Sequence, residues 1–390
     1  METTELRSLL GKIELTWSQR HRAEELYTNL CNAIEDEGFN INFYPQGSFA
    51  SKTAVRPYRD GKDQAYDVDV ICEFQDYSKA TIDAESLMNI LTNVMEKVAH
   101  AKNKKYELFE RCVTIHYEDD ETGASFSIDV IPAVKEDDGT IQNLRIETER
   151  PDLVDTSIAI AGLKSPKDWT TNNPRGFQTW FEDAVARFES DYIEYRATSG
   201  ASVDPLPDDV SPSNLLRNCV KILKRLRDIY YFESRAKSSS PSIIITTIVA
   251  KLSSSILEAN NEAELLHQII RQLQQIVYVS GREEVYGREY NASLIGNIVK
   301  RDKEKWTLAN PANGEDNVLS SWNENNSTSA RDFFAWVKDL KRIDDSLSQA
   351  DLPESSADFQ LRGALGLVSG IDTGNVHNVS GQVIRPWRDE

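Results

Sequence analysis

The sequence predicts an α+β protein in which strands are concentrated before residue 170 and helices dominate after it. Two stretches, 66–71 and 125–132, alternate aliphatic with polar side chains in the two-residue period of a strand. Longer stretches at 4–37 and 214–232 carry apolar residues at the three- and four-residue spacing of an amphipathic helix. These patterns indicate a first lobe built on a sheet and a second, mainly helical lobe.

The elements of the first lobe are predicted in chain order. A long helix is predicted over 4–37, and a second helix over 77–101 comes after the first of the two alternating strands. The stretch 107–118 has a strand pattern, and the turn at 119–123 joins it to the strand of 125–132. The last two strands are therefore expected to form a β-hairpin.

The rest of the chain is predicted from the same periodicity. Segments 141–148 and 155–163 have strand-like or irregular patterns, and the turn-forming residues at 172–176 separate them from the second lobe. The predicted helices of the second lobe cover 177–195, 214–232, 262–279 and 330–347. The tail 370–390 has little periodicity and is expected to be mobile or bound to a partner.

The stretch 46–71 contains the first residues for which chemistry is predicted. Asp67 and Asp69 alternate with aliphatic residues in a predicted strand, so both carboxylates lie on one face. Two such charges repel, and a bound cation usually offsets this repulsion. Carboxylate oxygens as ligands favour Mg²⁺ or Mn²⁺. Upstream, the turn at Gly47 and Ser48 offers backbone N–H groups and a hydroxyl to a phosphate. The pair and the turn together predict a site for a metal-bound nucleoside triphosphate.

A third carboxylate comes from the strand at 125–132. Asp129 alternates with Ile128 and Val130, which places it on the polar face of that strand. An aspartate embedded in a strand is costly to desolvate unless a cation or hydrogen-bond donors lie nearby. If the two strands are neighbours, the three carboxylates converge and can hold two divalent ions about 3.5–4 Å apart, as in two-metal active sites.

These motifs resemble those of the polymerase-beta nucleotidyltransferase superfamily and, within it, the bacterial relatives of cyclic GMP-AMP synthase. The resemblance is carried by Gln-Gly-Ser-Phe-x-x-x-Thr at 46–53, Tyr-Asp-Val-Asp-Val-Ile at 66–71 and Ser-Ile-Asp-Val-Ile-Pro at 127–132. Stretches 173–181 and 240–247 add to it, so it covers about the first two-thirds of the chain. These relatives are the cGAS/DncV-like nucleotidyltransferases (CD-NTases) of anti-phage (CBASS) signalling, which carry the SMODS nucleotidyltransferase domain.

The resemblance implies a two-lobed, polymerase-beta-like core with a mixed sheet, followed by a mainly α-helical C-terminal lobe. Residues 1–170 would form the catalytic lobe and begin with a spine helix that joins the two lobes. Residues 171–390 would form the helical lobe, which closes over the nucleotide and ends in a flexible tail.

The resemblance also implies nucleotide contacts from the helical lobe. In family members a lysine on the helix of 214–232 and a serine that opens the next helix reach the triphosphate, and Lys224 and Ser242 match those positions best. Lys221, one turn away, is the rival lysine. The residues by themselves favour another interpretation, in which the basic side chains form a solvated helix face and Ser242, after Pro241, caps a helix.

The activity implied by the resemblance is the joining of ribonucleoside triphosphates, ATP among them, into a cyclic di- or trinucleotide with 2′–5′ or 3′–5′ linkages. Asp67 and Asp69 would hold the ion that carries the donor triphosphate, and with Asp129 a second ion near the acceptor hydroxyl. The nucleotide contacts expected from the turn are Gln46, Gly47 and Ser48. Regulatory partner proteins and a downstream effector that senses the product are implied as well.

Two other functions share these features. A nucleotidyltransferase acting on RNA or on a small-molecule acceptor would carry the same carboxylates, and a pseudoenzyme would bind nucleotide without turnover. The formal net charge of -19 is opposite to the basic stripe of an RNA-binding surface, which disfavours a polymer acceptor. The intact set of three carboxylates disfavours a pseudoenzyme, because a binding module gains nothing from three desolvated acids.

The composition also indicates the cellular compartment and whether a structural metal is expected. The four cysteines form no Cys-x-x-Cys pair, which favours reduced thiols over structural zinc. The N-terminus is acidic and polar, unlike a signal peptide, and the most apolar stretch, 243–252, is too short to span a bilayer. The sequence therefore predicts a cytoplasmic protein without a membrane segment.

Overall fold

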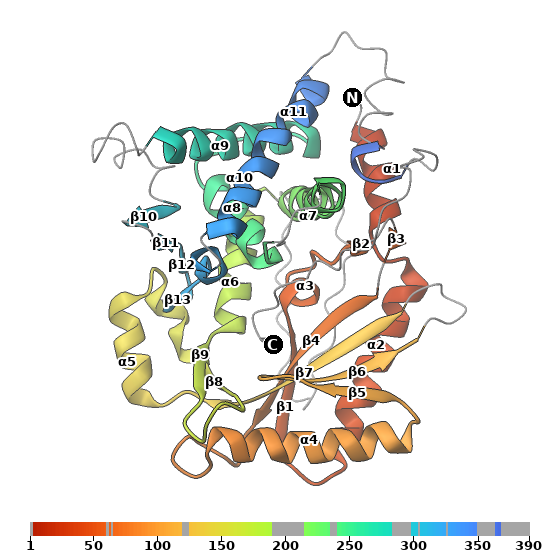
Figure 1. The fold of residues 1–390 in the computed structure, drawn as a ribbon, viewed down its shortest axis with the longest axis vertical. Coiled ribbons are helices and arrows are strands. Elements are labelled where there is room, and N and C mark those ends of the chain that lie inside the picture. The colour runs from red at the N-terminus through yellow and green to blue at the C-terminus, as the bar shows by residue number, and fades with distance from the viewer. Residues whose placement is uncertain are drawn as a thin grey trace.

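The computed structural model describes residues 3–59, 62–63, 65–118, 125–188, 214–234, 240–282, 298–302, 305–324, 327–348 and 363–367. Within these residues a sheet lies below a group of helices, and further helices pack on the far side of the sheet (Figure 1). The predicted α+β class with a mixed sheet is confirmed. The predicted turn at 119–123 and the tail 370–390 lie outside the described residues.

The first lobe is organised around a seven-stranded sheet. The main path through it runs in the order β1 (Ile41–Gln46), β4 (Tyr66–Phe74), β7 (Phe126–Lys135), β6 (Val113–Tyr117) and β5 (Lys105–Leu108). Two further strands, β8 (Ile158–Ala161) and β9 (Trp169–Asn172), continue from the end of β7. β4 and β7 run parallel, whereas β6 and β7 form the predicted antiparallel pair. The central pair, β4 and β7, carries the predicted aspartates.

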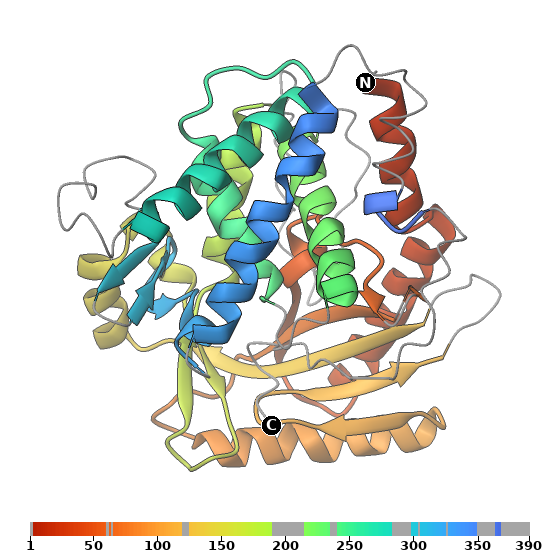
Figure 2. The same cartoon turned by 45° about the horizontal axis from the view of Figure 1, so that its top comes forward.

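One face of this sheet is closed by two helices. α2 (Trp17–Glu35) and α4 (Ala84–Ala101) share an apolar core with the sheet residues Val68, Val70 and Ile128. Because side chains alternate along a strand, the residues between these aliphatics point to the opposite face. That opposite face carries the aspartates and lies toward the helical lobe (Figure 2).

The single helix predicted over 4–37 is wrong, because the chain forms two helices there. α1 (Thr3–Ile13) ends before Thr16, and Thr16 starts α2 with a capping box. The Gln19 N–H donates to Thr16 Oγ1 at 3.3 Å, and the Thr16 N–H donates to Gln19 Oε1 at 3.0 Å. α1 packs into the core of the helical lobe, whereas α2 packs on the sheet. The N-terminal segment therefore joins the two lobes as two separate helices.

Capping aspartates also correct two other predictions. The segment 141–148 is helical rather than strand-like, because Asp137 accepts from the Thr140 N–H at 2.9 Å and starts α5 (Asp138–Glu147). Asp83 accepts from the Ser86 N–H at 2.8 Å, so α4 begins at Ala84 and not near residue 77. The segment 155–163 is mixed, with a 3₁₀ helix, η1 (Pro151–Thr156), leading into β8.

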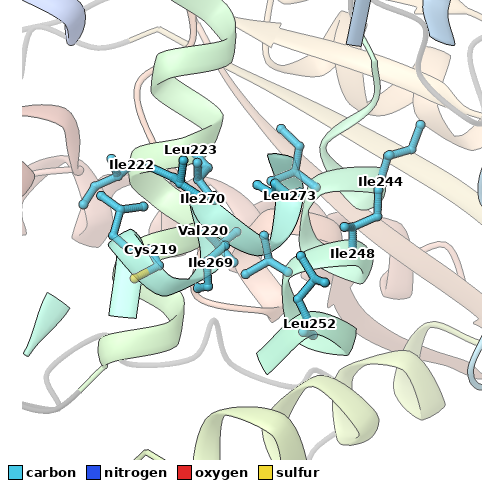
Figure 3. Close-up of a cluster of buried hydrophobic side chains, with 14 of the residues drawn as sticks. Cys219, Val220, Ile222, Leu223, Ile244, Ile248, Leu252, Ile269, Ile270 and Leu273 are labelled. Carbon is cyan, nitrogen blue, oxygen red and sulfur yellow. The ribbon is translucent and has the colours of Figure 1, made fainter. Parts of the chain in front are cut away.

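The second lobe is mainly helical, and its apolar core lies between α7, α8 and α9. Figure 3 shows side chains from these three helices packed together, including Val220, Ile248 and Ile269. The helices are α6 (Pro174–Ala186), α7 (Leu215–Ser234), α8 (Ser242–Ser253), α9 (Glu262–Arg282), α10 (Thr328–Asp339) and α11 (Lys341–Ser348). The last two correct the single helix predicted over 330–347. None of the described helices combines the length and the apolar character that a bilayer crossing requires.

Short elements complete the described part of the chain. Two small hairpins pair β10 (Lys300–Asp302) with β11 (Lys305–Thr307), and β12 (Ala309–Asn310) with β13 (Asn313–Asn317). A 3₁₀ helix, η3 (Ser320–Asn323), comes after them. Near β4, α3 (Gly47–Ala50) follows β1 directly, and β2 (Tyr58–Arg59) pairs with β3 (Lys62–Asp63).

Candidate active site

The predicted carboxylates lie on the face of the sheet that looks toward the helical lobe. β4 and β7 are paired with Asp69 opposite Asp129 and with Asp67 opposite Ser127. Asp129 is fully buried and Asp69 is 8% exposed, so the two acids are held at paired positions in a largely desolvated place. The strands are therefore neighbours, as a convergence of three carboxylates requires.

Two hydroxyl groups orient these carboxylates. Thr114 on β6 is fully buried, and its Oγ1 donates to Asp129 Oδ1 at 2.7 Å. The Ser127 hydroxyl donates to Asp67 Oδ1. A hydrogen bond to an ionised acceptor is stronger than a neutral one, so each donor favours one side-chain orientation of its aspartate. Thr114 was not among the residues predicted from the sequence. Its alternation with Val113 and Ile115 places it on the other side of β6 from these aliphatic residues, which is the face that carries Asp129.

The Gly-Ser turn lies directly against the carboxylates. β1 ends with Gln46 opposite Asp69, and Gly47 comes next with a φ of +65°. A Cβ on Gly47 would lie 2.5 Å from Asp69 Oδ2, which is closer than any real contact of this kind. Only glycine combines this backbone conformation with this approach. Ser48 is the next residue of α3, so the turn predicted to bind phosphate is in contact with β4.

Gln46 has the properties of a ligand-binding side chain. It is 4% exposed, and its Nε2 has no hydrogen-bond partner among the residues described. A buried donor left unpaired costs free energy, and such groups in native structures generally have a reason. Because Gln46 is paired with Asp69 across the β1–β4 ladder, its side chain is on the face that carries the carboxylates. Its position fits the predicted contact with a nucleotide.

Lys224 reaches the same region from the helical lobe. Its Nζ donates to Thr53 Oγ1 at 2.7 Å and to the Thr53 carbonyl at 3.1 Å, and Thr53 lies just after α3. Burial lowers the pKa of Lys224 to about 7. That value includes the charges of Arg227 and Lys221, which also lower the pKa, and those of Asp228 and Asp69, which raise it. Lys224 is therefore close enough to Asp69 on β4 for the two charges to interact.

The rival lysine points elsewhere. Lys221 is buried, and its Nζ donates to Glu14 Oε1 at 2.8 Å, in the connection between α1 and α2. The interpretation of the basic residues as a solvated face is wrong, because α7 passes through the interior of the lobe. Its buried basic side chains instead bind carbonyls and acids of other segments; they are Arg217, Lys221, Lys224, Arg225 and Arg227.

Ser242 is the first residue of α8, and Pro241 before it occupies the N-cap position without a side-chain cap hydrogen bond. The Ser242 Oγ accepts from Arg227 Nη1 at 3.1 Å. Arg227 is on α7, one turn after Lys224, so the structure places Ser242 beside the same helix. Its predicted contact with the triphosphate stays a prediction.

The donor set of the site fits a hard divalent cation, because the three aspartates offer only oxygen. As these side chains are placed, no group of three or more His, Cys, Asp or Glu residues in the described part of the chain is arranged to hold an ion. Mg²⁺ is commonly bound by one or two carboxylates together with substrate phosphates rather than by an all-protein cage. The residues therefore fit an ion that is completed by the phosphates of a nucleotide.

The two lysines provide a test of this assignment. We expect Lys224→Met to raise the KM for nucleotide at least about tenfold, because it removes a charge that would contact phosphate. Lys221→Met, the matched control, should change this KM less, because Lys221 is bound to Glu14. In the wild type, kcat/KM should fall as the pH rises through about 7, since Lys224 then loses its proton. Steady-state kinetics across pH measures both effects, and a larger KM effect from Lys221→Met would reverse the assignment.

Comparisons with known proteins show which proteins this chain is similar to. Residues 41–131 match the family model of the cyclic GMP-AMP synthase DncV-like nucleotidyltransferase domain. A c-di-GMP synthase of Roseivirga ehrenbergii is 26% identical over 262 residues, which span 64% of this chain and 61% of that protein. The match thus covers less than two-thirds of the relative.

Solved structures extend the likeness to the helical lobe. The CD-NTase CdnG of Bradyrhizobium diazoefficiens, in complex with GTP, superposes with a TM-score of 0.60 at 19% identity over 94% of this chain and 96% of that one. CdnC of E. coli MS115-1, in a complex with HORMA, superposes with a TM-score of 0.58 at 14% identity over 94% and 97%. Residues 41–131 are therefore a nucleotidyltransferase domain. The domain is of the DncV-like family, and the chain as a whole has the fold of the bacterial CD-NTases, which confirms the resemblance of its motifs.

Proposed function

We propose that this protein is a cyclic oligonucleotide synthase, which joins ribonucleoside triphosphates by nucleotidyl transfer and releases pyrophosphate. The observation that carries the proposal is the pairing of Asp69 with Asp129 on neighbouring strands, directly against the turn at Gly47. A carboxylate pair in contact with a phosphate-binding turn is the arrangement that phosphoryl-transfer chemistry requires.

Each residue has a role that follows from its position. Asp67, Asp69 and Asp129 would hold two divalent ions, Mg²⁺ or Mn²⁺, which when bound lower the pKa of the acceptor hydroxyl and neutralise phosphate charge. Ser48 and the Gly47 backbone would bind the β- and γ-phosphates. The remaining contacts that we propose are Gln46, Lys224 and Ser242, with Lys221 as the weaker candidate.

The reaction needs an acceptor held in line with the bond that breaks. The acceptor oxygen forms a bond to the α-phosphorus while the bond from that phosphorus to the pyrophosphate oxygen breaks. Fixed groups on β4, β7 and α7 contribute mainly by holding the two nucleotides in this geometry. A second transfer on the linear intermediate would close the ring.

The domain division that we propose assigns residues 1–170 to the catalytic lobe and 171–390 to the helical lobe, with α1 packed on the latter. The substrates we propose are ribonucleoside triphosphates, ATP among them. The names of the similar proteins, a c-di-GMP synthase and a CD-NTase bound to GTP, add GTP to this set. We also propose a role in CBASS signalling, with an effector that senses the product, which the resemblance of the motifs supports.

A regulatory protein partner is part of this proposal. The similar CdnC was solved in complex with HORMA, which supports a protein of that kind as a regulator. The alternative, transfer to RNA, is opposed by the net charge of -19, since a polymer acceptor needs a basic surface.

One experiment tests the proposed activity. The purified protein is incubated with all four ribonucleoside triphosphates and Mg²⁺ or Mn²⁺, treated with phosphatase, and its products are resolved by mass spectrometry. We expect a phosphatase-resistant cyclic species that is lost in an Asp67/Asp69 double alanine variant. A labelled RNA or small-molecule product from the same mixture supplied with acceptors, without a cyclic species, would establish the alternative.

A further inference from the structure

Two hydroxyl groups lie between the Gly-Ser turn and Lys224. Ser51 Oγ is 2.9 Å from the Gly47 carbonyl oxygen and 2.8 Å from Thr53 Oγ1. Thr53 Oγ1 in turn is 2.7 Å from Lys224 Nζ. The chain of hydrogen bonds therefore starts at the turn in the catalytic lobe and ends on α7 in the helical lobe.

The direction of donation along this series of hydrogen bonds is fixed at both ends. The Gly47 carbonyl can only accept, so the Ser51 proton points to it. Ser51 Oγ must then accept from Thr53, which leaves Thr53 Oγ1 to accept from Lys224. The protonated amine of Lys224 can only donate, so this is the one assignment that satisfies every member of the chain.

The chain is buried and is tied to the backbone. Thr53 is fully buried and Ser51 is 5% exposed. The Thr53 N–H donates to the Ser48 carbonyl at 2.8 Å, and the Thr53 carbonyl accepts a second hydrogen bond from Lys224. Hydrogen bonds between buried groups face little competition from water and restrict the geometry of their members. Together these bonds keep a flexible lysine at one place beside the turn.

We propose that Thr53, supported by Ser51, is a positioning residue that holds the amine of Lys224 beside the Gly47–Ser48 turn for binding of the nucleoside triphosphate. This inference rests on the proposed function and deepens it. Neither hydroxyl is needed to contact the substrate. Each acts by fixing a cation from one lobe against a phosphate-binding turn of the other, so part of the ordering of Lys224 is complete before the nucleotide arrives.

Kinetics of variants test the role of Thr53. Thr53→Val keeps the shape of the side chain and removes the acceptor, so we expect the KM for ATP to rise about tenfold, the effect of one hydrogen bond to a charged group. The change in kcat should be smaller, because the hydroxyl does not touch the reacting atoms. Thr53→Ser should restore the KM, and Ser51→Ala should give an intermediate value.

A matched control separates this role from the general cost of removing a threonine hydroxyl. Thr92 on α4 also has a hydrogen-bonded hydroxyl, with its Oγ1 donating to the Met88 carbonyl at 2.8 Å. α4 covers the far face of the sheet, so Thr92→Val should leave the KM for ATP unchanged. Equal KM effects from Thr53→Val and Thr92→Val would overturn the proposal.

A second readout needs no turnover. In protein labelled with ¹³C at lysine Cε, the resonance that disappears in Lys224→Arg belongs to Lys224, and its chemical shift reports the protonation of the amine with pH. Removal of an acceptor that favours the charged amine should move the midpoint of this titration to lower pH in Thr53→Val, with recovery in Thr53→Ser. Thermal melting confirms that each variant is folded.

The two readouts distinguish the inference from the function on which it rests. A shifted Lys224 midpoint in Thr53→Val, together with a wild-type protein that makes no nucleotide product, would overturn the proposed function and support the positioning of Lys224. An unchanged midpoint, together with normal synthesis of a cyclic product by the wild type, would overturn the positioning role and leave the function in place.

Discussion

Replacement of Asp69 by asparagine is expected to reduce nucleotide incorporation by about a thousandfold or more, because metal-ion catalysis supplies several kcal/mol of transition-state stabilisation. Asparagine has nearly the same size and keeps one oxygen acceptor, so the change removes charge rather than packing. Asp69 and Asp129 occupy paired positions on neighbouring strands. The loss of one charge therefore weakens a repulsion, and the Tm of the metal-free protein should stay equal or rise.

The control for this variant lies on the same strand. Glu73 is also on β4, farther along the same face as Asp69, and it is paired with Ala133 instead of an acid. Glu73→Gln removes an equal charge from β4 without touching the predicted site, so incorporation should be close to that of the wild type. Product assays by mass spectrometry and thermal melts measure the two properties. Undiminished product from Asp69→Asn would exclude Asp69 from the site.

The central strands were predictable because their chemistry is local. Alternation alone placed Asp67 and Asp69 on one face and Asp129 on the polar face of a second strand, and the β4–β7 register brings these faces together. The Gly-Ser turn is also predictable from local sequence, because it lies only about twenty residues before Asp67 and Asp69. Motif resemblance adds the polymerase-beta-like core with a mixed sheet and a helical lobe that closes over the nucleotide.

The parts that were missed depend on contacts between distant segments. The Thr53 hydroxyl binds Lys224 from 171 positions earlier in the chain, and no local pattern indicates that pairing. The helical repeat favours a solvated face for the basic residues of α7, because nothing in it reveals that both sides of the helix are covered. Their partners, such as the Leu365 carbonyl that accepts from Arg225 Nε at 3.0 Å, come from other elements.

The predicted helix boundaries were wrong for a different reason. The stretch 4–37 has continuous apolar periodicity, but Thr16 and Gln19 form a capping box that starts a second helix. A capping box can be recognised from sequence when a break is expected, but here the periodicity continues through it. The two halves then pack into different cores, which the period of a pattern does not distinguish.

Gly47→Ala is expected to have the second largest effect, and it tests the contact between the turn and the catalytic strand. The new Cβ would lie 2.5 Å from Asp69 Oδ2, so either the turn or the carboxylate must move. A misplacement of about 1 Å in an active site costs on the order of a hundredfold in rate. Alanine at a φ of +65° also costs about 1–2 kcal/mol of stability, because its Cβ approaches the following carbonyl.

A second glycine provides a control that separates the cost of the left-handed backbone conformation from the collision of the new Cβ with Asp69. Gly38, just after α2, has a φ of +91°, and a Cβ there would meet nothing within 4 Å. Gly38→Ala should therefore lower the Tm by a similar amount while incorporation falls little, whereas Gly47→Ala should lower both. Comparable activity in the two variants would show that Asp69 does not depend on the close approach of the turn. A loss confined to Gly47→Ala would establish that the absence of a side chain at this position is what allows the phosphate-binding turn and a catalytic carboxylate to share one site.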